Sequence, residues 1–426
     1  MEKLVLDTYE RPSWYKWILL SLQHVFAMFG ATVLVPILTG LDVSVALIGS
    51  GIGTLIYIIA TKAKVPMYLG SSFAYITAVG SAYAVNGNFN SALVGFMVVG
   101  LIYVVVAILI KYFGVKWLKW LLPSVVVGPM IMVIGLSLAP VAVSQITNLA
   151  NGSIVGWEGY LVAFVTFITI VIVSVKAKGF LKIIPFLIGI VTGYLTALAV
   201  GIVDYSLFDN LVLFHLPKFQ FIGTYSLDFS ALYIFIPLAF VTIMEHIGDH
   251  QVLGAVMERD FLSEPGLDKT LIGDGVATFF AGLIGAPANT SYGENTGVVA
   301  LTKVGSVWVT GLAAVLAIFL AFIMPVNAFI RSIPNPVLGG MALVLFGMIA
   351  ANGLKVIVED KVDLNEIRNV IIIASMLVVG LGGLVITIGA GGAVKLETMA
   401  LAAVVGIVVN LLFKLLDLII PNKKKA

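Results

Sequence analysis

The stretch "NTSYGENTG", residues 289–297, decides how this chain folds, because it interrupts a series of long apolar segments. It holds the carboxylate of Glu294, an amide-rich turn and two glycines. A continuous membrane helix would not contain such a break, since charges and unpaired backbone groups are costly in lipid. The stretch therefore predicts a short helix that follows a few extended residues inside a membrane.

The composition places the whole chain in a membrane. Of 426 residues, 60% are hydrophobic and 11% are charged, about half the charged fraction of a typical soluble domain. The apolar runs do not alternate with polar residues as β-barrel strands do, so we expect an all-α polytopic membrane protein. The absence of cysteine excludes disulfides, thiolate metal sites and cysteine nucleophiles.

Hydrophobic runs predict fourteen transmembrane segments, of which the third and tenth are unusually short. The expected spans are 15–38, 43–61, 72–87, 91–111, 121–142, 158–176, 183–203, 229–252, 269–285, 292–302, 306–326, 335–353, 369–389 and 396–418. With both termini in the cytoplasm, all but three of the 24 basic residues fall inside, the exceptions being Lys218, Arg331 and Lys395. The closing "NKKKA" (422–426) is then a cytoplasmic anchor.

The two halves of the chain resemble each other. "LIGSGIGT" (47–54) matches "LIGDGVAT" (271–278), and Ser71-Ser72-Phe73 matches Thr290-Ser291-Tyr292 in the same order. Each half holds seven spans, so the second copy must enter the membrane from the opposite side. We expect an inverted 7+7 repeat, residues 1–206 and 229–420, in which two half-helices meet near the bilayer centre.

Ionisable residues inside apolar segments are the candidate functional groups, because each costs about 2.5–3.5 kcal/mol to insert. Glu245 and Asp249 share one helix face, Glu294 begins segment ten, and His24 lies within segment one. The structural alternatives are a bonded acid at Glu245, a dipole charge at Glu294, a rim position for Asp249 and an interhelical strut at His24. 

Three other titratable residues receive no role. Asp274 opens segment nine beside two glycines, and its repeat partner is Ser50, so we expect a wet interfacial position rather than a site. We expect His246 and His250 to face elsewhere on their helix or to approach the interface.

The polar groups favour a small neutral ligand. Two carboxylates repel an anion but accept N–H donors, while the free N–H groups at the helix starts suit carbonyl oxygens. Phe73 and Tyr292 flank the two breaks symmetrically and favour a flat ring, although simple packing is the alternative. A buried carboxyl has a raised pKa and can take up and release a proton, so a proton-coupled carrier is expected.

The segment "ENTGVVALTK" (294–303) resembles the signature of the nucleobase–ascorbate transporter family, also called nucleobase:cation symporter-2. "SLQHVFAMFGATVLVP" (21–36), "YLGSSFAY" (68–75) and "AFVTIMEHIGDH" (239–250) are similar to its bacterial uracil permease branch, and the resemblance covers nearly the whole chain. It implies short antiparallel strands in segments three and ten, a core of segments 1–4 and 8–11, and a gate of segments 5–7 and 12–14. It also implies proton-coupled uracil import across the bacterial cytoplasmic membrane by a homodimer with no cofactor or metal.

The resemblance implies roles for individual residues. Glu245 and Glu294 would accept the pyrimidine N–H groups, the backbone N–H groups of Phe73 and Gly293 would meet its carbonyls, and Tyr292 would lie nearby. The remaining implied roles are substrate contact for Ser72, proton coupling for Glu245, Asp249 and His24, and gate contact for Phe346.

Two positions depart from the uracil permease pattern. Some relatives have His where this chain has Asp249, so proton handling would rest on an acid pair, Glu245 with Asp249. A related uracil permease has Tyr where this chain has Phe346, so the gate contact would be apolar.

Three other readings stay open. The nearest is a xanthine or other purine carrier of the same fold, although Glu294 at the first signature position favours uracil. A passive channel is a second reading. A membrane enzyme is the third; the sequence has neither an HExxH nor a G-x-S-x-G motif, but Glu245, Asp249 and the histidines could form a metal cluster.

Overall fold

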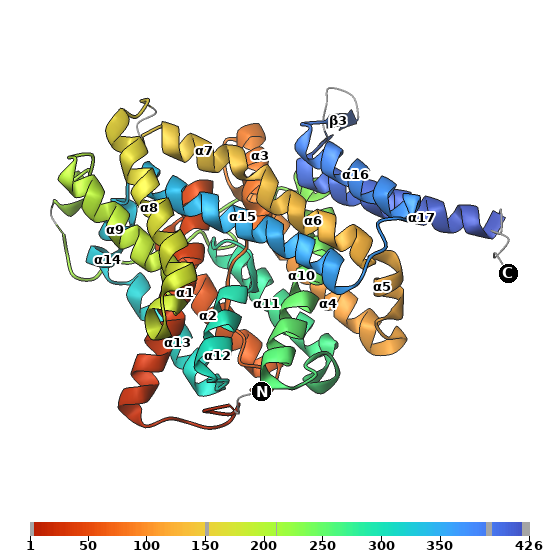
Figure 1. Ribbon diagram of the computed structural model, residues 1–426, viewed down its shortest axis with the longest axis horizontal. Helices are drawn as coiled ribbons and strands as arrows, with labels where there is room; N and C mark the ends of the chain where they lie inside the picture. Colours follow the sequence, from red (N-terminus) through yellow and green to blue (C-terminus); the bar gives the residue numbers. More distant parts are fainter. Residues whose placement is uncertain (1–3, 150–152, 210, 389–393, 420–426) are drawn as a thin grey trace.

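The computed structural model describes residues 4–149, 153–209, 211–388 and 394–419, and within them the chain is mostly helical (Figure 1). The C-terminal lysines lie outside the described residues. The α-helices are α1 (Trp14–Thr39), α2 (Val43–Ala60), α3 (Ile76–Asn86), α4 (Asn90–Phe113), α5 (Lys116–Leu121), α6 (Ser124–Ser137), α7 (Ala139–Thr147), α8 (Trp157–Lys176), α9 (Pro185–Ala199), α10 (Leu232–Met257), α11 (Leu267–Ile284), α12 (Gly293–Thr302), α13 (Val307–Ala321), α14 (Met324–Arg331), α15 (Asn335–Glu359), α16 (Ile367–Leu381) and α17 (Thr398–Ile419). Short strands are β1 (Leu69–Ser71), β2 (Asn289–Ser291), β3 (Val385–Ile388) and β4 (Val394–Glu397), and short helical turns include η1 (Phe73–Tyr75), η2 (Gly179–Ile183) and η4 (Leu262–Gly266).

Several of these helices are long and apolar enough to cross a membrane. Among the described residues, eight spans meet that standard by length and composition: α1, α2, α4, the α6–α7 pair, α8, α10, α15 and α17. Three more apolar helices, α9, α13 and α16, are shorter. The expectation of a multi-pass helical membrane protein is confirmed.

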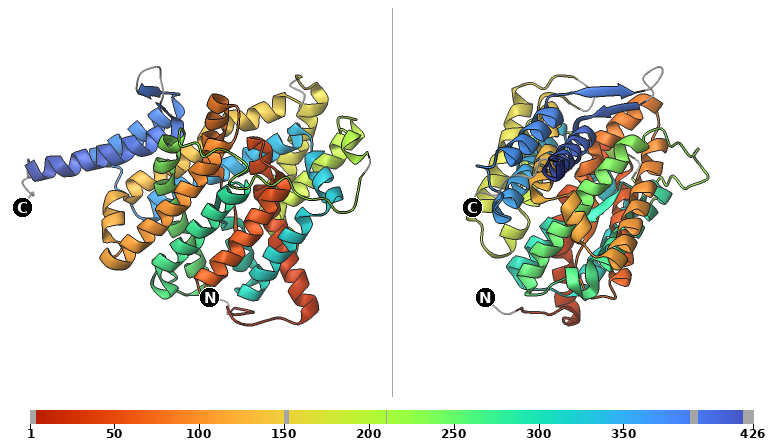
Figure 2. Two further views of the ribbon diagram at one scale, coloured as in Figure 1. Left: turned by 180° about the vertical axis from the view of Figure 1, so that it is seen from behind. Right: turned by 90° about the vertical axis from the view of Figure 1, so that its right-hand side faces the viewer.

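The helices pack in two groups. In the first, α4 and α2 pack on α11, α13 packs on α1 and α2, and α10 lies along α4. In the second, α15 packs on α6, α7 and α8, α9 packs on α8, and α16 and α17 pack on α6. The second group occupies the upper part of Figure 1, and the side view of Figure 2 separates its yellow and blue helices from the red, orange and green helices of the first. Contacts of α1 with α9 and of α10 with α6 and α17 join the groups.

Two segments differ from the expected spans. The fifth segment is divided at Leu138, because Pro140 lies in the first turn of α7 and has no N–H to continue α6. The thirteenth ends at Leu381 rather than near residue 389, because Gly382 and Gly383 terminate the helix, the latter with a φ of 71°. The β-branched residues that follow form β3, which pairs with β4.

Residues 289–297 do not form one continuous helix. Asn289–Ser291 forms β2 and is followed by the ten-residue helix α12, while Leu69–Ser71 forms β1 and is followed by η1 and α3. The two strands pair antiparallel, with Gly70 opposite Thr290. Gly70 has no room for a side chain, because a Cβ there would lie 2.5 Å from the Tyr292 ring.

Candidate functional site

The site begins where the two strands end. Beyond the ladder, the Ser72 N–H donates to the Ala288 carbonyl over 2.9 Å, and the Tyr292 N–H donates to the Tyr68 carbonyl over 3.0 Å. Each chain then enters a helix directly, η1 at Phe73 and α12 at Gly293. The antiparallel pairing therefore brings the N-terminal ends of two helices to either side of one short ladder.

Neighbouring helices hold the strands in place through threonine hydroxyls. Thr54 of α2 donates to the Leu69 carbonyl of β1 and accepts from the Leu69 N–H at 2.9 Å. Thr278 of α11 donates to the Asn289 carbonyl of β2 over 3.1 Å. Backbone N–H and C=O groups inside a membrane need hydrogen-bond partners, and these hydroxyls supply partners for the non-helical backbone of the strands.

The two helix starts present free donors. Among the described residues, neither the Phe73 N–H nor the Gly293 N–H donates to a protein acceptor. The Gly293 backbone is exposed, whereas the Phe73 side chain is buried. Such N–H groups at helix N-termini attract the acceptor atoms of a ligand.

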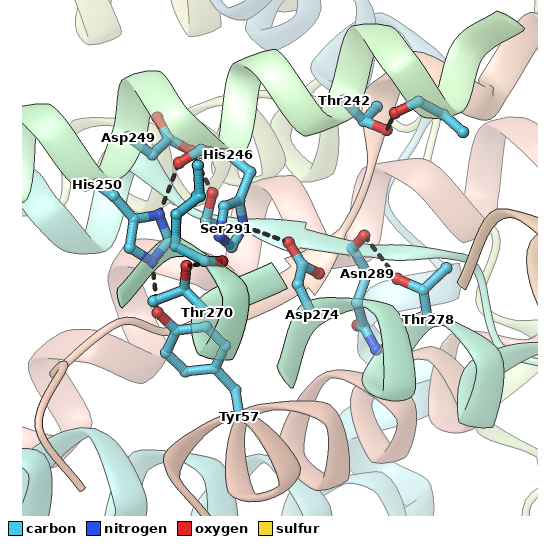
Figure 3. A network of polar contacts seen from close by, with 12 residues as sticks. Tyr57, Thr242, His246, Asp249, His250, Thr270, Asp274, Thr278, Asn289 and Ser291 are labelled. Carbon is cyan, nitrogen blue, oxygen red and sulfur yellow. Dashed lines mark hydrogen bonds and ion pairs between the residues drawn. The ribbon is translucent and has the colours of Figure 1, made fainter. Parts of the chain in front are cut away.

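Acidic side chains lie beside these donors. Glu294 is in the first turn of α12, and α10, which carries Glu245 and Asp249, packs against β2, η1 and α12. The Asp249 carboxylate accepts a 2.6 Å hydrogen bond from the Ser291 hydroxyl at the end of β2 (Figure 3). Asp249 and Glu294 are close enough to Glu245 to interact with it electrostatically, and all three acids are half-buried. The residues predicted to be the acidic constellation are therefore brought together, and the contact with β2 places Asp249 beside the ladder rather than at the rim.

His24 is tied to α12. The Asn295 side-chain N–H₂ donates to the His24 carbonyl at 3.2 Å, which fixes the amide orientation, and the same nitrogen lies 3.0 Å from His24 Nδ1. Nδ1 must then accept, so this histidine is neutral with its proton on Nε2. The strut expected as one alternative for His24 is present.

Aromatic rings line the ladder from two sides. The Tyr292 hydroxyl donates to the Ser71 carbonyl at 2.9 Å and accepts from Thr32, so this ring is buried against β1. Phe73 lies edge-to-face with Phe346 of α15, with ring centroids 6.1 Å apart. Phe346 thus reaches the site from the second helix group.

Ser72 is another residue predicted to contact the substrate. Its side chain is buried, and its hydroxyl has no protein partner among the described residues; the same holds for Thr290 of β2. Both residues belong to the triplets that the repeat pattern matches, but no ligand role was predicted for Thr290.

The interfacial position expected for Asp274 is wrong. His246 and His250 face elsewhere on α10, toward α2 and α11, and do not approach the interface. Asp274 is fully buried and lies 2.7 Å from His246 Nδ1, itself fully buried (Figure 3). His250 stacks on His246, with ring centroids 4.0 Å apart, and its Nε2 bonds the Tyr57 hydroxyl. An acid within an apolar segment was the available signal, but its polar repeat partner, Ser50, favoured an interfacial position. These side chains pack α10 against α2 and α11.

A metal cluster of Glu245, Asp249 and the histidines was one alternative for this acidic region. In the part of the chain that the structure describes, no three His, Asp or Glu side chains are grouped so that they could hold a metal ion.

Two interrupted membrane segments that meet beside free helix N-termini and acidic side chains are typical of a membrane transporter. Residues 15–389 match the family model described as the Permease family. The chain belongs to the nucleobase–ascorbate transporter family, in its uracil permease branch.

Curated relatives match over their full length. The chain is 46% identical to the uracil permease of Bacillus caldolyticus, covering 100% of this chain and 97% of the relative. It is 43% identical to the uracil permease of Bacillus subtilis (96% and 95% covered) and 40% identical to that of Escherichia coli K12 (99% and 97% covered).

Solved structures share the fold at low identity. The transmembrane domain of the cyanobacterial bicarbonate transporter BicA matches with a TM-score of 0.61 and 15% identity, covering 96% of this chain and 99% of that chain. The murine Slc26a9 anion transporter in its inward-facing state matches with a TM-score of 0.70 and 12% identity, covering 96% and 70%.

Proposed function

We propose that this chain imports uracil by proton symport across the bacterial cytoplasmic membrane. The observation that carries the proposal is the β1–β2 crossing, which sets two free helix N-termini beside Glu245, Asp249 and Glu294. The names of the full-length relatives supply the substrate. No cofactor is needed, because the coupling ion is the proton itself.

We infer fourteen spans in an inverted repeat. The eight long spans and three shorter apolar helices, together with α3, α11 and α12, correspond one to one with the expected segments. The ladder supports the symmetry, because Thr54 and Thr278 occupy matching repeat positions and hold the two strands in matching ways. The first helix group would then be the core and the second the gate, with both termini cytoplasmic and two copies forming a homodimer.

In the proposed complex, uracil lies between the starts of η1 and α12. The Glu294 carboxylate and the carbonyl oxygen of the protonated Glu245 carboxyl accept its two N–H groups, and the N–H groups of Phe73 and Gly293 donate to its carbonyls. A pyrimidine with two donors and two acceptors satisfies every one of these groups, whereas an anion would be repelled by the acids. The unpartnered Ser72 hydroxyl supplies one further polar contact.

In the proposed cycle, the acidic side chains couple the movement of a proton to that of uracil. Glu245 is protonated from outside, uracil binds, the core moves against the gate, and both ligands are released inside. Asp249 shares this proton with Glu245 from the next helical turn and is held by Ser291, while neutral His24 keeps α12 in position. Only a difference in affinity between the two conformations can drive such a shift.

Uptake of radiolabelled uracil into proteoliposomes tests the proposal. We expect saturable uptake that an inward proton gradient stimulates and excess unlabelled uracil blocks. Saturable uptake of labelled xanthine that excess uracil does not block would assign the chain to the purine carriers, and uptake without saturation or proton movement would indicate a channel.

A further inference from the structure

The N-terminal segment of residues 5–10, hereafter the N-terminal strap, is bonded along the connection between α12 and α13. The Val5 N–H donates to the Lys303 carbonyl over 2.8 Å, the Gly305 N–H donates to the Leu6 carbonyl over 2.9 Å, and the Val307 N–H donates to the Thr8 carbonyl over 3.0 Å. Leu6 and Val304 form a parallel β-bridge. Three backbone hydrogen bonds in succession hold the end of α12 to the strap.

Side chains extend the same attachment into α13. The Ser306 hydroxyl donates to the Glu10 carbonyl at 2.6 Å, and the Trp308 ring N–H donates to the Tyr9 carbonyl at 3.2 Å. The Trp17 ring N–H, near the start of α1, donates to the Trp308 carbonyl at 2.7 Å. The strap is thus anchored at both of its ends.

The strap is also bonded to the end of α10. Arg259, two residues beyond the last residue of α10, donates to both carboxylate oxygens of Asp7 at 2.8 Å and to the Thr8 hydroxyl at 2.7 Å. Thr8 is fully buried, and the two charged side chains are 37% and 47% exposed. The Arg259 Nη2 contacts both Asp7 carboxylate oxygens while its Nη1 donates to Thr8, so one planar guanidinium holds two adjacent strap residues in place.

The two attached helices are the ones that carry the acids of the site. α10 holds Glu245 and Asp249, and α12 holds Glu294 in its first turn. A ten-residue helix is too short to be stable by itself, so the position of α12 depends on what holds its ends. The ladder holds the first end, and the strap holds the second.

We propose that the N-terminal strap is a clamp that sets the distance between α10 and α12, and that Asp7 and Arg259 are positioning residues for substrate binding. The inference rests on the proposed function for its substrate, although the clamp itself is a matter of geometry. Loosening the pair would let α12 shift relative to α10, so two carboxylates would no longer fit one small ligand.

The test compares Asp7→Asn, Arg259→Gln and the charge-swapped pair Asp7→Arg with Arg259→Asp in the purified full chain. The control is Glu264→Gln, which breaks the 2.5 Å Lys64–Glu264 pair; among the described residues, no hydrogen bond joins either of these side chains to the strap. Two kinds of measurement are made. The first gives the Kd, the KM and the maximal rate for uracil, and the second gives the hydrogen-exchange rates of the α12 amides without uracil.

We expect each single variant to raise the Kd and KM about two- to fivefold, with little change in maximal rate and faster exchange in α12. The swapped pair should restore both quantities, and the Glu264→Gln control should match the unmodified protein. If Arg259→Gln fails to fold, Asp7→Asn carries the test, because it keeps the side-chain volume.

Unchanged uracil affinity and unchanged α12 exchange in a folded single variant would overturn the clamp. So would a swapped pair that restores neither quantity, or an equal effect from Glu264→Gln. If the unmodified protein does not bind uracil, the proposed function fails, while the exchange measurement still decides whether the strap holds α12.

Discussion

Glu294 interacts both with the dipole of its own helix and with a neighbouring acid. As the second residue of α12, it places a negative charge at the positive end of the helix dipole, which lowers the cost of keeping a carboxylate in the membrane. Its side chain is half-buried and lies beside α10, where it interacts electrostatically with Glu245. A neutral substitute keeps the shape but loses the charge-assisted hydrogen bond to a ligand N–H.

We therefore expect Glu294→Gln to weaken uracil binding by about 1.5–3 kcal/mol, or roughly 10- to 100-fold. Xanthine binding should fall less, because purine carriers of this family tend to have Gln at this position. Competition of both ligands against labelled uracil measures the two affinities. An equal loss for both would remove Glu294 from the ligand contacts.

Glu245 separates coupling from binding. In Glu245→Gln the side chain can still bond a ligand but cannot exchange a proton. We expect accumulation of uracil against a gradient to be lost, with exchange of labelled for unlabelled uracil largely kept. Proteoliposomes loaded with uracil, or empty, distinguish the two activities. Normal accumulation in Glu245→Gln would assign the coupling to another group.

At the scale of elements, close helix packing supports the ladder. α11 carries Thr278, which holds β2, and α11 packs closely on α4 at Gly275. A Cβ at Gly275 would lie 2.6 Å from the Tyr103 Cβ and 2.7 Å from the Gly100 carbonyl oxygen, neither of which can move easily. The position of β2 thus depends on two helices meeting backbone to backbone.

Gly275→Ala should destabilise the protein by about 1–3 kcal/mol through overpacking. The matched control is Gly80→Ala in α3, an exposed helical glycine with open space around it, where alanine should be neutral or slightly stabilising. Thermal unfolding of the two purified variants measures the difference. Similar melting temperatures would show that α4 and α11 can separate without cost.

At the scale of the whole molecule, the two helix groups must move relative to each other if the proposed cycle is right. α1 of the first group meets α9 of the second at Gly30, where a Cβ would lie 3.4 Å from the Phe186 Cβ. That separation is close to the Cβ–Cβ distance of a disulfide, about 3.5–4.5 Å. The native chain has no cysteine that would compete.

Gly30→Cys with Phe186→Cys should therefore form a disulfide that holds the groups together. We expect uptake to stop on oxidation and to return on reduction, while each single cysteine variant transports under both conditions. Uptake that continues in the fully oxidised double variant would contradict relative movement of the two groups at this contact.

The sequence alone identified much of this protein for one physical reason: polar groups in lipid are costly, so each interruption of an apolar segment is informative. The breaks at residues 68–75 and 289–297 and the acids Glu245 and Glu294 stand out because of that cost.

The tertiary structure decided what depends on partners distant in the chain. Asp274 is buried against His246, which lies 28 residues away in the chain. Asp249 and the strap residue Asp7 likewise bond to distant partners, Ser291 and Arg259. Hydropathy records how apolar a segment is but not which face another helix covers. The pairing of buried polar groups is therefore fixed only when the helices pack.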